Sequence, residues 1–222
     1  SLSMKDFRHA SVVLMYRYDL VPFRPEIFYL QQKYIMPTYD LPPGRVHRGD
    51  MRCEFRLNDA FNINALFTAE RNDHYYNYQT VPGNVLSAQT LEVTTFRSRF
   101  DLNLALFARA VECALGYEFS RYDAELNITY SPVHSLTNSL KYNGSRWTFE
   151  WNNRYIGQVY TSPFTDAQLG NVVLGDFGIQ RKMLESFFAY IKIENLYNHQ
   201  YNLRDGYPEQ GLTVLGGIRV FI

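Results

Sequence analysis

The sequence predicts an all-β protein, an antiparallel transmembrane β-barrel of the outer-membrane type with about 12 to 13 strands in its 222 residues. Three observations predict this fold: apolar and polar residues alternate along many segments, these segments are long, and aromatic residues stand near their ends. The composition agrees, because 46% of the residues are hydrophobic and 16% are aromatic, while the mean hydropathy is negative at -0.30. Apolar residues must therefore be interspersed with polar ones.

Alternation of period two places every second side chain on the same face of a strand. It is clearest in residues 147–159, where Trp147 and Trp151 share one face while Glu150 and Arg154 share the other. One face is therefore apolar and the opposite face is charged. The same alternation recurs at 51–57, 61–69, 122–130, 187–194 and 212–222.

Strand length separates a membrane barrel from a soluble sheet. Strands of soluble β-sandwiches usually have about 5–6 residues and turn their polar face to water. The alternating segments here commonly have about 9–14 residues, which fits strands tilted across a bilayer. The sequence has no run of about 18 apolar residues, so a membrane-spanning helix is excluded. Aromatic residues suited to the interfacial girdles of a barrel are Tyr122, Tyr130, Trp147 and Tyr160.

The expected connections alternate in length, as they do in outer-membrane barrels with short periplasmic turns and longer outer loops. One of the short connections contains the hairpin signal Asn143-Gly144. Tight turns are expected at 57–59, 120–121, 142–146 and 181–185. Longer links are expected at 36–46, 72–90, 161–170 and 197–210.

The expected strand count has one irregularity. If the C-terminus lies on the periplasmic side and 122–130 runs outward, counting back makes both 91–104 and 60–71 run outward as well. One inward strand between these two is then missing. Either residues 75–81 form it, closed by the turn at 82–84, or residues outside the sequence do, and both alternatives stay open here.

No catalytic or metal-binding pattern stands out. The five histidines lack ligand spacing, and no paired-carboxylate or nucleophile-elbow constellation is present, so we expect no enzyme, no metal site and no cofactor. Cys53 and Cys113 lie in strand-like segments without metal spacing and are expected to be ordinary strand residues. With 22 basic and 22 acidic residues and no basic stripe, nucleic acid is not expected as a partner.

The end of the chain resembles a known family. Residues 195–201, Asn-Leu-Tyr-Asn-His-Gln-Tyr, resemble the Asn-Leu-Phe-Asp/Asn-x-x-Tyr element before the last loop of TonB-dependent receptors. Residues 206–211, Gly-Tyr-Pro-Glu-Gln-Gly, resemble the Gly-Tyr-Pro-x-x-Gly of that loop, and a last strand ending at the terminus completes the pattern. Two positions depart from it: Leu212 stands where members usually have Arg, and the chain ends in Ile222 where members often end in Phe.

The resemblance implies that residues 1–222 are the C-terminal portion of a barrel of about 22 strands, with the plug domain outside them. One part of a split receptor and a reduced relative of the family are the alternatives. It implies a receptor of the bacterial outer membrane for energy-coupled nutrient uptake. The expected partners are outer-membrane lipid, the plug domain, the remaining barrel strands, the periplasmic energy-coupling protein TonB acting through the plug, and a small-molecule or oligomeric nutrient. A passive outer-membrane pore or surface-binding barrel is the alternative. An outer-membrane hydrolase that uses His134 or His199 is a third class.

The resemblance also implies that residues of the outer loops bind the substrate. At Tyr197 and Tyr201, a place in the interfacial aromatic belt competes with ligand binding. The candidate binding residues are His199, Tyr201, Arg204, Asp205, Tyr207 and Glu209.

Charged residues on the polar strand faces are expected to point into the lumen. We expect cross-strand salt bridges among most of them. The pairs Arg97/Arg99 and Arg52/Arg56 offer an alternative role, the attraction of an anionic substrate. The lumen-facing set is Arg48, Asp50, Arg52, Glu54, Arg56, Arg97, Arg99, Asp101, Glu150, Arg154, Lys192 and Glu194.

Overall fold

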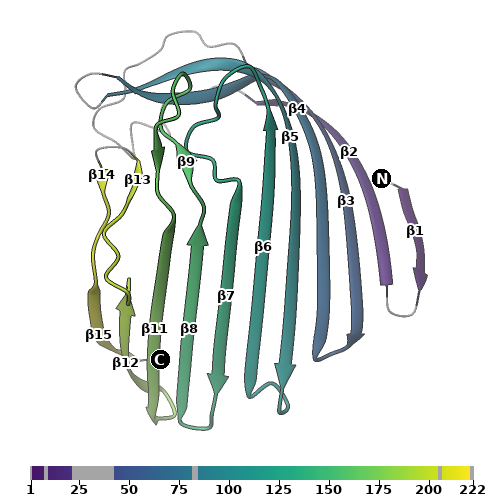
Figure 1. Cartoon of the computed structure of the whole chain (residues 1–222). Coiled ribbons are helices and arrows are strands. Elements are labelled where there is room, and N and C mark those ends of the chain that lie inside the picture. The colour runs from purple at the N-terminus through teal and green to yellow at the C-terminus, as the bar shows by residue number, and fades with distance from the viewer. Residues whose placement is uncertain (1, 8–9, 22–42, 82–84, 205–206, 221–222) are drawn as a thin grey trace.

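A computed structural model describes residues 2–7, 10–21, 43–81, 85–204 and 207–220 of the chain. These residues form fifteen strands (Figure 1). None of the described residues belongs to a helix long and apolar enough to cross a membrane. The main sheet contains β1 (Leu2–Phe7), β2 (Ala10–Val21), β3 (Gly44–Asn58), β4 (Phe61–Val81), β5 (Val85–Leu106), β6 (Val111–Asp123), β7 (His134–Asn143), β8 (Trp147–Ile156), β11 (Val172–Leu184), β12 (Phe187–Glu194) and β15 (Thr213–Val220). Two short pairs lie outside it: β9 (Val159–Tyr160) with β10 (Gln168–Leu169), and β13 (Asn202–Arg204) with β14 (Tyr207–Pro208).

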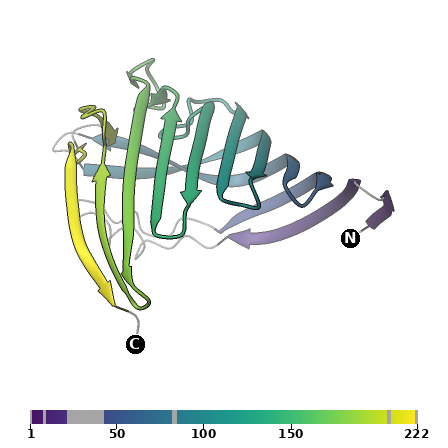
Figure 2. The same ribbon diagram turned by 90° about the horizontal axis from the view of Figure 1, so that it is seen from below.

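The main sheet has eleven strands, and each strand pairs antiparallel with the next one of the sheet along the chain. The sheet curves into a trough, with β1 at one edge and β15 at the other (Figure 2). The described part of the chain does not close it. The fold class expected from the sequence, the wall of an antiparallel barrel, is confirmed.

The two ends of the trough differ in their connections. At one end, named the turn end, two to four residues join β3 to β4, β5 to β6, β7 to β8 and β11 to β12. The other end, named the loop end, carries the tip of the β4–β5 hairpin and the connections 124–133, 157–171 and 195–212. The expected alternation of short and long connections is therefore present.

The convex face carries the apolar side chains. Leu140, Trp151 and Phe177 lie side by side on neighbouring strands. Trp151 is 41% exposed and Ile191 is 51% exposed. A soluble protein buries most side chains of this kind, whereas a transmembrane barrel turns them outward to lipid. The surface is thus inverted relative to that of a soluble sheet protein.

Hydrogen-bonded tyrosines follow the loop end of the convex face. The hydroxyl of Tyr16 lies 2.8 Å from Nδ1 of His47, and the hydroxyl of Tyr117 lies 2.9 Å from Nδ1 of His134. Tyr155 belongs to the same row and donates to Oδ1 of Asn171 at 3.1 Å. Tyrosines satisfy both sides of a membrane interface, because the ring is apolar and the hydroxyl is polar.

Trp147 marks the limit of the same face at the turn end. The Trp147 ring stacks on the ring of Phe149 with centroids 6.1 Å apart. The guanidinium carbon of Arg181 lies 5.0 Å from the centroid of the Trp147 ring. Trp147 and Tyr155 stand near opposite ends of β8, about 26 Å apart at about 3.3 Å per residue, which is close to the apolar band of about 25 Å in outer-membrane barrels. Aromatic residues therefore bound the apolar face at both ends, but of the four girdle residues that the sequence predicts only Trp147 is among them. Tyr122 lies on the concave face of β6, Tyr130 lies in the connection 124–133, and Tyr160 belongs to the separate β9–β10 pair.

One predicted strand is wrong. The alternation at 122–130 predicted a strand that follows a turn at 120–121, but β6 runs through that position to Asp123, and residues 124–133 leave the sheet. Ile128 is buried, and Thr129 makes a parallel bridge to Tyr160. The alternation there reflects how a loop packs, and it does not reflect a membrane strand.

This correction removes the irregularity in the strand count. β4 and β5 form one hairpin, paired from Phe61 with Leu104 to Val81 with Val85, where the sequence predicted a long link at 72–90. Residues 75–81 extend β4 and are not a separate strand, and the hairpin tip at 82–84 lies outside the described residues. With β6 counted once, every strand of the sheet reverses direction relative to its neighbours.

Candidate binding site on the concave face

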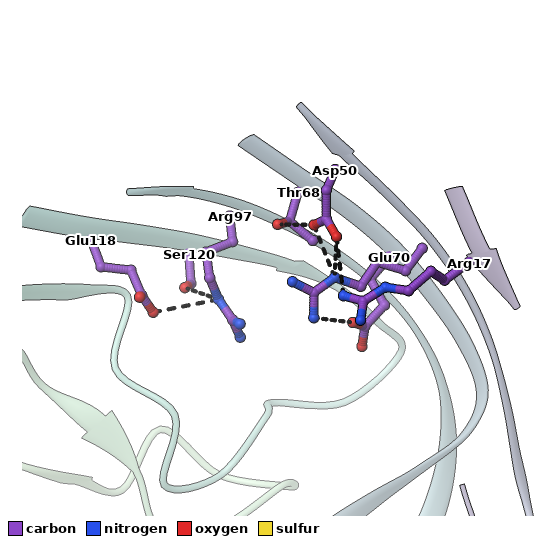
Figure 3. A network of polar contacts seen from close by, with 8 residues as sticks. Arg17, Asp50, Thr68, Glu70, Arg97, Glu118 and Ser120 are labelled. Atoms are coloured by element: carbon purple, nitrogen blue, oxygen red, sulfur yellow. Dashed lines mark hydrogen bonds and ion pairs between the residues drawn. The ribbon is translucent and has the colours of Figure 1, made fainter. Parts of the chain in front are cut away.

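The concave face carries a network of ion pairs (Figure 3). A carboxylate oxygen of Asp50 accepts hydrogen bonds from Arg48 at 2.9 Å and from the Thr68 hydroxyl at 2.7 Å, and Arg17 donates to Asp50 at 3.2 Å. Arg48 also lies 3.9 Å from Glu70. Figure 3 shows these side chains pointing from the strands into the space that the sheet curves around. The charged residues of this network therefore point into the lumen, as expected, and they pair with one another.

Many of these pairs join two residues of the same strand. Residues two positions apart on a strand share a face and lie about 6.6 Å apart, a separation that a long cationic side chain can bridge. Such pairs are Arg48–Asp50, Arg56–Glu54, Arg99–Asp101 and Lys192–Glu194, with distances of 2.9, 3.1, 2.9 and 2.6 Å.

The expected predominance of cross-strand bridges is therefore only partly right. Arg17–Asp50, Arg48–Glu70 and Arg97–Glu118 do cross between strands. Arg56, Arg97 and Arg99 each have an acidic partner, so the alternative that these arginines attract an anionic substrate loses support for them. Arg52 forms no ion pair with a described carboxylate, and for this residue the alternative stays a prediction. Arg154 likewise forms no ion pair with any described carboxylate.

Asn195 organises the loop between β12 and β15. It has a positive φ of 50°, a conformation that asparagine tolerates better than most residues. The side-chain nitrogen Nδ2 of Asn195 donates to the backbone oxygens of His199 at 3.0 Å and Gln210 at 3.2 Å. The side-chain oxygen Oδ1 accepts from the backbone N–H of His199 at 3.0 Å. The backbone N–H of Asn195 itself donates to Asp176 at 3.1 Å. The first residue of the family-like motif therefore holds both ends of the loop together.

The next residues of the motif attach the loop to the convex face. The N–H of Leu196 donates to the backbone oxygen of Gly175 at 2.6 Å. The ring of Tyr197 lies against Gly175, where an added Cβ would come within 2.5 Å of it. The Tyr197 hydroxyl donates to Oδ1 of Asn153 at 2.6 Å, and the Asn153 amide donates to Asn138 at 2.7 Å. Tyr197 thus joins the tyrosine row, as expected.

A polar hollow of about 820 Å³ lies on the concave face beside this loop. Its lining includes Arg99, Asp101, Arg154, Asp176, Tyr201 and Glu209. A hollow of about 720 Å³ adjoins it and is lined by His199, Tyr201 and Glu209 among others. Another of about 410 Å³ is lined by Tyr130, Arg154 and Val172 among others. Arg154 and Tyr201 therefore stand where hollows meet.

Tyr201 presents a neutral hydroxyl to this site. Partial burial raises the pKa of Tyr201, and the negative charge of Glu209 raises it further, while Arg154 acts in the opposite direction. The hydroxyl stays protonated at neutral pH and can both donate and accept a hydrogen bond. The arrangement offers a ligand a guanidinium, a carboxylate and a phenol on one surface.

The structure brings together three of the six predicted binding residues. The rings of His199 and Tyr201 lie 6.5 Å apart, and the N–H of Glu209 donates to the backbone oxygen of Tyr201 at 3.0 Å. Arg204 and Tyr207 pair through their backbones in the β13–β14 ladder, but their side chains lie outside the described part of the chain. Asp205 lies outside it entirely. Tyr201 lines the hollow and is not part of the tyrosine row.

Sequence reasoning missed how much the wall contributes. Arg154 was placed only among the lumen-facing charges, and Asp176 was not singled out. The alternation of β8 gives Arg154 its face, but the register that sets it opposite Leu174, two residues from Asp176, is visible only in the folded sheet. Within the described residues no group of three His, Cys, Asp or Glu side chains can hold a metal ion.

The β4–β5 hairpin curves over the loop end of the sheet and is fixed there (Figure 1). Asn77 is 0% exposed. Its amide donates to the backbone oxygen of Asn127 at 2.9 Å, and its Oδ1 accepts from the N–H and the hydroxyl of Thr129 at 2.9 and 2.8 Å. The N–H of Asn127 in turn donates to the backbone oxygen of Pro163 at 3.2 Å. One buried side chain thus ties the hairpin to the connection 124–133, and the backbone of Asn127 ties that connection to 157–171.

Solved structures of outer-membrane proteins share this fold. The ferric-catecholate import receptor Fiu from E. coli K12 matches with a TM-score of 0.72 at 13% identity, over 98% of this chain and 34% of the receptor. The FrpB iron transporter from Neisseria meningitidis matches with a TM-score of 0.73 at 13% identity, over 98% and 37%. The pyoverdine outer membrane receptor FpvA from Pseudomonas aeruginosa PAO1, bound to pyoverdine, matches with 0.73 at 12% identity, over 99% and 35%.

The chain thus spans about a third of the length of these proteins. At such identities the likeness shows the fold. No protein-family model matches the sequence, and no curated protein matches it.

Proposed function

We propose that this chain forms part of the wall and the binding loops of a receptor in the bacterial outer membrane that takes up a nutrient with energy coupling through TonB. One observation carries the proposal: an apolar convex face bounded by aromatic residues encloses an ion-paired concave face with a polar hollow. The family-like motif at 195–211 and the likeness to import receptors support it.

The nutrient is a small or oligomeric molecule that binds in the polar hollow beside the loop 195–212. The neighbours named above are an import receptor, an iron transporter and a receptor bound to pyoverdine, so transport is the activity to test first and enzymatic activity is not proposed. In this scheme a plug domain and further barrel strands lie outside residues 1–222, and the described chain supplies the site and no chemistry.

Uptake by whole cells tests the proposal. Cells that lack the gene and cells that carry it on a plasmid are compared for growth and for uptake of labelled iron chelates and other scarce nutrients, with and without a protonophore. We expect one nutrient whose uptake needs both the protein and the proton gradient. Uptake that needs the protein but survives the protonophore would favour the passive pore. Equal growth and uptake on every nutrient, with or without the gene, would reject the receptor.

A further inference from the structure

The convex face carries a hollow of its own, which we name the outer groove. It has a volume of about 810 Å³ and extends over β2 to β6. The strand register places most of its lining residues on the convex face. Its lining includes Tyr16, Gly49, Met51, Phe67, Ala69 and Phe96. The outer groove is therefore separate from the polar hollows of the concave face.

Small residues between large ones create the outer groove. Gly49 pairs with Ala69, and Ala69 pairs with Phe96 on the next strand. A Cβ added at Gly49 would meet only the backbone oxygen of Ala69, at 4.0 Å, so the space above it is open. The ring of Phe67 packs edge-on against Phe100, with centroids 5.6 Å apart, on the turn-end side of Ala69. The floor of the groove is therefore low and its walls are large apolar side chains.

An unpaired cation lies beside the outer groove. Arg121 is exposed and stands opposite Phe96 in the register of β5 and β6, on the same convex face. It forms no ion pair with any described carboxylate, although Asp123 shares its face two residues further along the strand. Arg71, on the same face, already pairs with Glu92. The guanidinium of Arg121 is therefore available to a ligand.

The outer groove lies at the loop-end interface of the proposed membrane region, and this step rests on the membrane placement proposed above. Tyr16 lines the groove and belongs to the tyrosine row. Arg121 lies four residues nearer the loop end than Tyr117 of the same row, about 13 Å along β6 at about 3.3 Å per residue. Arg121 is thus placed among the lipid headgroups, and the groove lies beside it toward the acyl chains.

We infer that the outer groove binds one lipid that carries an anionic phosphate. Part of an acyl chain lies against Gly49 and Ala69, and oxygens of the phosphate accept hydrogen bonds from Arg121. A guanidinium offers a planar fork of donors that fits a phosphate, and basic pockets at a membrane surface bind lipid headgroups.

The other occupants fit less well. Bulk lipid covers the rest of the convex face without a fixed partner, whereas a groove beside an unpaired cation holds one molecule in a defined place. A soluble phosphate would leave the apolar floor of the groove empty. An apolar segment of a protein would fill the groove and leave Arg121 without a partner.

Native mass spectrometry of the full polypeptide, purified from outer membranes in a mild detergent, tests this inference. The probe is dimyristoyl phosphatidic acid. Dimyristoyl phosphatidylcholine is the lipid control, because it has the same chains while its choline neutralises the phosphate. Inorganic phosphate is the competitor without a chain. We expect phosphatidic acid to bind about tenfold more tightly than phosphatidylcholine, as for one added hydrogen bond to a charged group, and inorganic phosphate to leave it bound.

Matched variants assign the binding to the outer groove. Arg121→Gln should weaken the binding of phosphatidic acid by about tenfold, and Arg121→Lys should keep most of it because the charge remains. Ala69→Leu should weaken it as well, because the leucine fills the groove while the face stays apolar. Arg146→Gln at the turn end and Ala189→Leu, two residues from Ile191 on the same face, are the controls and should bind like wild type.

Four outcomes would overturn the inference: equal binding of the two lipids, equal affinity in all variants, displacement by inorganic phosphate, or a protein chain bound in place of the lipid. The expected lipid binding together with absent nutrient uptake would reject the transport function and keep the lipid site. Energy-coupled uptake without lipid selectivity would do the reverse. Recovery of the protein outside the membrane fraction would reject the membrane placement on which both depend.

Discussion

Arg154 differs from the arginines around it because it forms no ion pair with a described carboxylate. It also lies where two hollows of the concave face meet. A guanidinium in such a place offers a planar fork of donors to a carboxylate, a phosphate or a phenolate. Its partner is therefore expected to be a ligand. Arg99, which also lines the hollow, is already paired with Asp101, so its guanidinium is less available to a ligand.

We predict that Arg154→Gln lowers the affinity for an anionic nutrient by about tenfold or more, since a hydrogen bond to a charged group contributes about 1.5–3 kcal/mol. Initial uptake rates below half-saturation measure the effect, with outer-membrane abundance followed by immunoblot. Lys141→Gln, on the same face nearer the turn end, is the matched control. Equal losses in both variants would contradict a specific role for Arg154.

Tyr201 gives the loop a dependence on alkaline pH. Because burial and Glu209 raise its pKa above the ordinary value of about 10, the folded loop holds the phenol proton more tightly than the unfolded chain does. The stabilisation is complete below the ordinary pKa and is lost as the pH rises through the raised one. The tyrosinate absorbance of wild type minus that of Tyr201→Phe should titrate above about pH 10. A difference that titrates below this value would contradict the statement that burial and Glu209 raise the pKa of Tyr201.

At the scale of elements, the side chain of Asn77 on the β4–β5 hairpin holds the connection 124–133 in place. We predict that Asn77→Ala loosens residues 124–133, because it removes the hydrogen bonds that Asn77 makes with the C=O of Asn127 and with the N–H and hydroxyl of Thr129, each worth about 0.5–1.5 kcal/mol. Limited proteolysis of outer membranes should then cut within 124–133 faster than in wild type. Asn103→Ala, at an exposed position of β5, should leave the cleavage rate unchanged.

The joint between β11 and the loop 195–212 depends on the absence of a side chain at Gly175. Gly175→Ala places a Cβ 2.5 Å from the Tyr197 ring and should displace that ring together with its hydrogen bond to Asn153. We predict a lower midpoint of thermal unfolding for the detergent-solubilised protein. The double variant Gly175→Ala with Tyr197→Ala should lose less than the sum of the single variants, since the clash is gone. Additive losses would mean that the two residues act independently.

Local patterns predicted most of this architecture because a strand face is a local property. The faces of Trp151, Glu150 and Ile191 follow from alternation alone. The boundary of β6 does not, because 122–130 alternates like a strand while Asn77, far away in the chain, fixes Asn127 and Thr129 outside the sheet. Hydrogen bonds between residues far apart in the sequence determine the conformation of that segment, and a local pattern cannot predict them.

The binding site was predictable in part for a similar reason. The motif at 195–201 located the loop, and Tyr201 and Glu209 do line the hollow. The function of Asn195 as the link between the two ends of the loop could not be read from the sequence, because its partners His199 and Gln210 are backbone groups. The share of Arg154 and Asp176 in the site depends on the register between β8 and β11.

At the scale of the whole molecule, the convex face requires apolar side chains, whereas the concave face tolerates charged ones. We predict that Ile191→Arg, on the apolar convex face, reduces the amount of protein in the outer membrane, since a cation on the lipid face costs a barrel up to about 2–4 kcal/mol, with the largest cost at the midplane. Gln180→Arg, on the concave face of neighbouring β11, is the matched control and should assemble normally. Immunoblots of membrane fractions measure both. Normal assembly of Ile191→Arg would place that face in water.

The ion pairs that run along single strands have a consequence for how such a wall is built. Arg48–Asp50, Arg99–Asp101 and Lys192–Glu194 each compensate their charge within three consecutive residues. A hairpin that carries these pairs can therefore enter the bilayer before its neighbours arrive with these charges already paired. For these six residues, insertion strand by strand needs no compensation from the finished barrel.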